Sequence, residues 1–140
     1  MKKQELTDAL LNEAQRFLAL DRAALPAAAK QTYYNAVNAL RANGISPATG
    51  MLLVAAALSG DGRLTPNEEQ MLQDMMGRAP AETVLESLAA MTSDAYRAAG
   101  QLKALSDADL QPVISLVACF LAADGDVNRD ELASAADILS

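Results

Sequence analysis

Histidine and tryptophan are absent from this chain of 140 residues, and only one cysteine is present. Without histidine, the protein cannot build a catalytic triad based on that residue or a zinc site with imidazole ligands. A single cysteine excludes an internal disulfide bond, and its place in an apolar run predicts that Cys119 is an inert buried thiol. No motif of an enzyme class is found, so the sequence favours a non-catalytic protein.

Positive charge is also scarce, because 11 Lys and Arg face 18 Asp and Glu and give a net charge of -7. A protein that binds duplex nucleic acid needs a basic stripe, so we expect no nucleic-acid partner. Residues 1–5 are too polar to open a signal peptide. The longest mainly apolar run, residues 113–123, is about half of what a bilayer requires. We therefore expect a cytoplasmic protein that does not insert into membranes.

What the chain has in abundance is alanine, which occurs thirty times, while aromatic residues make up only 4%. Alanine is the strongest helix former, and its small side chain lets helices approach closely. Alternating β-branched segments are missing, and no Gly/Ser linker divides the sequence. These features predict an all-α fold: a single domain over residues 1–140, built as a compact bundle of about seven to eight short helices.

Apolar spacing and capping residues place the expected helices. In the first, Leu6, Leu10, Ala14, Phe17 and Leu18 are predicted to share one face. In the second, Pro26 suits the first turn and Gly44 is expected to cap the end. The third is apolar nearly all round and is expected to be the buried centre. In the seventh, Pro112 either kinks the helix or marks its true first turn. The expected ranges are about 5–20, 26–43, 47–59, 65–76, 81–91, 94–105, part of 107–123, and 128 to the end of the sequence.

An internal repeat becomes visible when the sequence is aligned with itself at an offset of 63 residues. Each unit contains an apolar helix, an Asp-Gly turn, an aliphatic residue, a capping residue and a Glu three positions later. The units cover about residues 46–77 and 107–140, and the N-terminal helices occupy about residues 5–44. A helix-turn-helix pair used twice can pack around a pseudo-twofold axis.

Most of each turn has a structural explanation. Thr65 and Asn128 are suited to cap the following helices, and Glu68 and Glu131 stand at the third helical position, which completes a capping box. The aspartate before each turn glycine has no such structural explanation. It lies near a helix C-terminus, where a negative charge opposes the helix dipole.

A true EF-hand is excluded by spacing, although Asp124, Asp126 and Asn128 occupy positions 1, 3 and 5 of such a loop. Position 6 requires glycine and holds Arg129, and position 12 requires glutamate and holds Ala135. A looser site for a hard divalent ion (Ca, Mg or Mn) is compatible with these residue types. Its candidate ligands are Asp124, Glu131, Asp126, Asp61 and Glu68. The alternative is that the acidic residues only hold the turns and cap the helices.

The two segments LSGDGRLTPNE (58–68) and LAADGDVNRDE (121–131) resemble the TerB-like family of tellurite-resistance proteins and the related N-terminal domain of DjlA-type co-chaperones. The resemblance covers about residues 45–140. The first turn departs from the family pattern, because Ser-Gly precedes its Asp-Gly and the cation Arg63 follows it. The second turn, which has the additional acids Asp126 and Asp130, is therefore the better candidate for an ion.

The resemblance implies a helical domain without known catalysis, whose acidic positions are proposed to bind metal ions. It also implies a role in a bacterial stress response of the tellurite-resistance type, often near membrane-bound partner proteins. By position, the implied acidic residues are Asp61, Glu68, Asp124 and Glu131. A second class of function stays open: a plain protein-protein interaction domain whose acidic turns are only structural caps.

Overall fold

The computed structural model describes residues 2–45, 66–76, 100–123, 125 and 127–139, and these residues form helices and turns without a strand among them. This confirms the all-α class for the described part of the chain. The elements are α1 (Lys3–Leu18), α2 (Leu25–Ala42), α4 (Pro66–Met76), α7 (Asp107–Leu121) and α8 (Arg129–Leu139).

Residues 100–102 are helical as well, so the described residues contain six helical segments rather than the expected seven to eight. The helices expected at about 47–59 and 81–91, and most of the one at 94–105, lie outside the described residues. The part of the first repeat unit that precedes α4, residues 46–65, also lies outside the described residues. The observed boundaries of the other helices differ from the expected ones by at most three residues, except that α8 is described only to Leu139.

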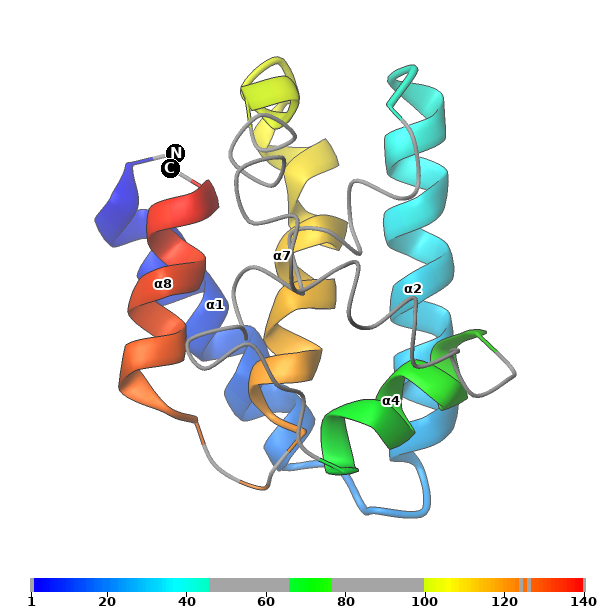
Figure 1. Cartoon of the computed structure of the whole chain (residues 1–140). Coiled ribbons are helices and arrows are strands. Elements are labelled where there is room, and N and C mark those ends of the chain that lie inside the picture. The colour runs from blue at the N-terminus through cyan, green and yellow to red at the C-terminus, as the bar shows by residue number, and fades with distance from the viewer. Residues whose placement is uncertain (1, 46–65, 77–99, 124, 126, 140) are drawn as a thin grey trace.

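Among the described helices, α7 takes the central position. Figure 1 shows it with α1 and α8 on one side and α2 on the other, while α4 crosses near the start of α2. Nine of its residues are buried: Leu110, Val113, Ile114, Leu116, Val117, Ala118, Cys119, Phe120 and Leu121. A helix that is apolar on nearly every side must be covered all round. The helix expected as the buried centre, at about 47–59, lies outside the described residues. Pro112 lies within α7, in its second turn.

No helix in the described part of the chain combines the length and the apolar character needed to cross a membrane.

The apolar face of α1 follows the predicted spacing, with one correction. Leu6, Leu10, Ala14 and Phe17 are all buried, with at most 2% of their surface exposed. Leu18, which was expected on the same face, is 36% exposed. It directly follows Phe17, and one residue turns the side-chain direction by about 100°, which takes Leu18 out of the stripe.

Polar side chains also join α1 to α7. The Ser115 hydroxyl donates to Glu13 Oε2 at 3.0 Å, and Arg16 donates to the same oxygen at 2.8 and 3.2 Å. The carboxylate therefore keeps its hydrogen-bond partners although it is partly buried, which limits the cost of its desolvation.

The end of α2 confirms the predicted cap. Gly44 has φ +71°, its N–H donates to Arg41 O, and the Ile45 N–H donates to Leu40 O at 2.9 Å. This is the Schellman arrangement, in which a left-handed residue satisfies the last carbonyl groups of a helix. At the other end of α2, Pro26 lies in the first turn as expected.

We predict that replacing Leu10 with Ala lowers the free energy of unfolding by about 2–5 kcal/mol, because it leaves a cavity in the core. Leu18→Ala, a matched change on the same helix, should cost less than about 1 kcal/mol since its side chain is partly solvated. Urea unfolding of both variants checks this. Equal losses would contradict the packing of α1 described above.

Candidate functional site

The turn between α7 and α8 contains a glycine with a positive φ angle. Gly125 adopts φ +90°, and its N–H donates to the Ala122 carbonyl at 3.1 Å. This conformation is costly for residues with a Cβ atom, which explains the glycine. Asp124 and Asp126, the two candidate ligands on either side of it in the sequence, lie outside the described residues.

Asn128 is the N-cap of α8, as expected. Its side-chain Oδ1 accepts hydrogen bonds from the N–H groups of Asp130 at 2.8 Å and Glu131 at 3.2 Å. Glu131 is half-buried in the first turn of the helix, and Val127 packs against the core on the other side of the cap. The cap thus fixes the start of α8 and the position of Glu131.

Of the first turn, the structure describes only the part from Pro66 onward, so the candidate Asp61 and the expected cap Thr65 lie outside it. Glu68 belongs to the first turn of α4 and is only 1% exposed. A carboxylate at this position usually remains solvated, and its burial is costly unless charges or hydrogen bonds compensate for it. Glu68 is therefore held inside the protein rather than presented at the surface.

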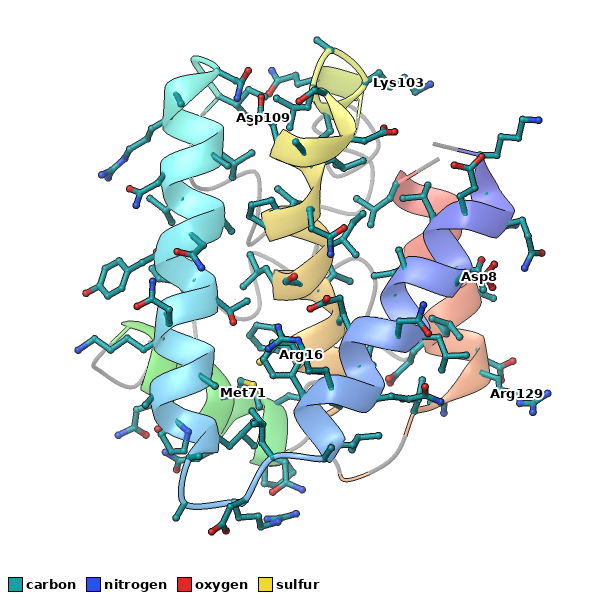
Figure 2. All side chains as sticks on the ribbon, turned by 180° about the vertical axis from the view of Figure 1, so that it is seen from behind. Asp8, Arg16, Met71, Lys103, Asp109 and Arg129 are labelled. Atoms are coloured by element: carbon teal, nitrogen blue, oxygen red, sulfur yellow. The ribbon has the colours of Figure 1, made fainter. Side chains whose placement is uncertain are left out.

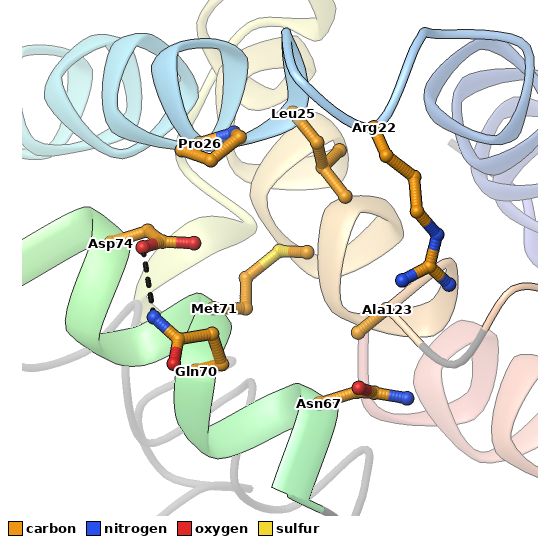
Figure 3. Close-up of a pocket in the computed structure, with 8 residues that line it drawn as sticks. All are labelled: Arg22, Leu25, Pro26, Asn67, Gln70, Met71, Asp74 and Ala123. Atoms are coloured by element: carbon orange, nitrogen blue, oxygen red, sulfur yellow. Dashed lines mark hydrogen bonds between the residues drawn. The ribbon is translucent and has the colours of Figure 1, made fainter.

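A cavity of about 160 Å³ lies between the start of α2, α4 and the end of α7. We call it the turn pocket. Figure 3 shows Leu25 and Met71 in its middle, with Arg22 and Asp74 on opposite sides. Its lining consists of Arg22, Leu25, Pro26, Asn67, Gln70, Met71, Asp74 and Ala123.

The turn pocket brings together the described flanks of both acidic turns. Asn67 stands two positions after Thr65, and Ala123 directly precedes Asp124 in the sequence. Both residues line the same cavity although they are far apart in the sequence. Asn67 and Ala123, which follow the first turn and precede the second turn in the sequence, are therefore neighbours in space.

Arg22 adds a positive charge that the sequence analysis did not place at the second turn. A Cβ atom placed on Gly125 would lie 3.8 Å from Arg22 Nη2, so the guanidinium lies against the second turn. Sequence reasoning missed this residue, because Arg22 stands alone in the connection between α1 and α2 and belongs to no motif. Only the packing of the helices brings it to the turn.

Within the described residues, no group of three or more Cys, Asp or Glu side chains is close enough to hold a metal ion. Three of the five candidate ligands, Asp61, Asp124 and Asp126, lie outside that part of the chain. The other two, Glu68 and Glu131, lie in the first turns of two different helices, α4 and α8.

Cys119 is buried as predicted, and it contacts the wall of the turn pocket. Its thiol donates to the sulfur of Met71 at 3.1 Å, which joins α7 to α4. Burial raises the pKa of this thiol from its ordinary 9.0 to about 12, against a smaller opposing effect of Arg16. The thiol is therefore protonated and unreactive at neutral pH.

Comparison of the chain with models of protein families, with curated proteins and with solved structures finds no match.

We predict that Asn128→Ala lowers the free energy of unfolding by about 1 kcal/mol, because two N–H groups at the start of α8 lose their acceptor. Asn128→Asp should retain most of the stability, since aspartate is an equally good N-cap. Urea unfolding of the two variants tests the cap. Equal destabilisation by Ala and Asp would show that the oxygen acceptor is not what matters.

The raised pKa of Cys119 predicts a pH dependence of stability. Between pH 9 and 12 the unfolded state releases the thiol proton while the folded state keeps it. Folding therefore loses up to about 1.4 kcal/mol per pH unit in this window. Below pH 9 both states are protonated and no such loss occurs. The measurement is the difference in unfolding free energy between wild type and Cys119→Ala from pH 7 to 11, and a constant difference would refute the prediction.

Proposed function

We propose that this protein is a non-catalytic binding module of the TerB-like kind, which binds a divalent cation through the acidic side chains of its two Asp-Gly turns. The observation that carries the proposal is that Asn67 and Ala123, from the two repeat units, line one pocket. The proposal requires carboxylates from both turns to converge on one ion.

Carboxylate oxygens are the ligands that Ca²⁺, Mg²⁺ and Mn²⁺ prefer, and several must converge on one ion. The turns offer five such side chains: Asp61, Glu68, Asp124, Asp126 and Glu131. The net charge of -7 further raises the local concentration of cations around the protein. The second turn is the preferred site, because its flanking residues contain more acids.

The biological role in this proposal is taken from the resemblance of the two Asp-Gly segments to the TerB-like family. The module would act in a bacterial stress response of the tellurite-resistance type, through a protein partner that is often membrane-bound in that family. The repeat of about residues 46–77 and 107–140 and a single domain over the whole chain are part of the same proposal. Non-catalytic function is included because the chain has no histidine and no catalytic motif.

The competing proposal is a plain protein-protein interaction domain whose acidic turns are structural. Two observations favour it. Asn128 caps α8 with its own side-chain oxygen, so the turn has a structural role of its own. Arg22 lies against Gly125 of the second turn, where its positive charge opposes a bound cation. Under this proposal the surface that binds the partner protein lies elsewhere on the molecule.

Thermal unfolding with and without millimolar Ca²⁺, Mg²⁺ or Mn²⁺ separates the two proposals. An ion at about a hundred times its dissociation constant adds about 2.7 kcal/mol, which is several degrees for a domain of this size. The gain should vanish in Asp61→Asn/Asp124→Asn. It should persist in the control Asp8→Asn/Asp109→Asn, which removes the same charge from exposed positions, with Asp109 at the opposite end of α7 from Met71 (Figure 2).

The variant Arg22→Gln provides a second test of cation binding, in which the affinity is expected to increase. Removing the guanidinium beside Gly125 removes a repulsive charge, so the affinity for the cation should rise several-fold. If neither wild type nor Arg22→Gln is stabilised by any of the three ions, cation binding is wrong and the turns are structural caps.

A further inference from the structure

The turn pocket has a second property that cation binding does not use: it combines one cation with an apolar wall. Leu25, Pro26, Met71 and Ala123 supply the apolar surface, and Met71 is nearly fully buried at 4% exposure. Arg22 is the only positively charged residue of the eight that line the cavity. Within the described part of the chain, its side chain takes part in no ion pair.

From these features we propose that the turn pocket binds a carboxylate joined to a small apolar group, with the carboxylate on Arg22 and the apolar group against Met71 and Leu25. The guanidinium fork matches the two oxygens of a carboxylate. This site uses other residues than the proposed cation site, because its ligand is held by Arg22 rather than by the acidic side chains of the turns.

The size of the cavity limits the apolar group. A volume of about 160 Å³ is close to that of cavities that hold one benzene molecule, so a branched group of four carbons or a single ring fills it. Met71 is suited to such a wall, because its flexible, polarizable side chain adjusts to the shape of what it contacts.

The charges in the turn pocket orient this ligand. Asp74 lies on the opposite side of Met71 from Arg22 and accepts a hydrogen bond from Gln70 Nε2 at 3.1 Å (Figure 3). Its negative charge repels a carboxylate from that side, so the acid group is directed to Arg22. A phosphate dianion fits less well, since it would meet one cation together with the nearby Asp74.

Two sources can supply this chemistry: a free small acid, or the C-terminal residue of a peptide with an apolar last side chain. The rim supports both, because Arg22, Pro26, Asn67 and Gln70 are exposed and leave room for a chain to continue into solvent. The experiment therefore uses one probe of each kind, 4-methylpentanoate and the peptide acetyl-Gly-Ser-Gly-Leu with a free carboxyl end.

Binding is measured through the methyl resonance of Met71 in protein labelled with ¹³C-methyl methionine, with Met71→Leu used for assignment. At least one probe should shift this resonance in a saturable way at millimolar concentrations. Arg22→Gln should weaken binding at least about tenfold, because the charge-assisted hydrogen bonds are lost. Arg41→Gln, which removes the same charge at the other end of α2, should have no effect.

The peptide with an amidated C-terminus is the control for the carboxylate. Saturation by the free peptide alone assigns the pocket to peptide ends, and saturation by 4-methylpentanoate alone assigns it to small acids. The proposal is overturned if the amidated peptide binds as well as the free one. It is also overturned if Arg22→Gln changes nothing, or if neither probe shifts Met71. Arg22→Gln is expected to strengthen cation binding and weaken carboxylate binding, so the two proposals can fail separately.

Discussion

The burial of α7 on nearly every side is the constraint on which the rest of the described structure depends. A helix with nine buried residues cannot lie at the surface, so α1, α2 and α8 must pack around it. Alanine makes this possible at close range, since Ala14, Ala29 and Ala36 are buried on the helices that face it. Near the C-terminal end of α7, α1 ends and α2 and α8 begin. Polar side chains, among them Arg22 and Asn67, lie at that end of the bundle.

The position of Arg22 follows from this arrangement. Both α1 and α2 pack against α7, and the short connection between them passes the C-terminal end of α7, next to Ala123 and Gly125. The guanidinium is brought to the second turn by the packing of three helices and not by any local sequence signal. Met71 reaches the same place from α4, and its contact with Cys119 fixes α4 against α7.

The sequence therefore predicted local structure well and the site only in part. Gly44, Asn128 and the apolar stripe of α1 follow from rules that act within one or two turns of a helix, and the structure confirms them. The prediction that Leu18 lies on the buried face of α1 was wrong, because that face is too narrow to include every apolar residue next to it in the sequence. The burial of Glu68 and the nearness of Arg22 to Gly125 depend on contacts between distant segments, which composition and spacing do not encode.

The charges around Arg22 set the sign of any coupling between the two proposed sites. An isolated guanidinium beside the second turn opposes a cation there, whereas a guanidinium that holds a carboxylate contributes little net charge. A ligand on Arg22 would thus favour the cation, and linkage requires that the cation favour the ligand by the same factor. A module built in this way would respond to the two together more strongly than to either alone, which separates it from a pair of helical hairpins held only by their caps.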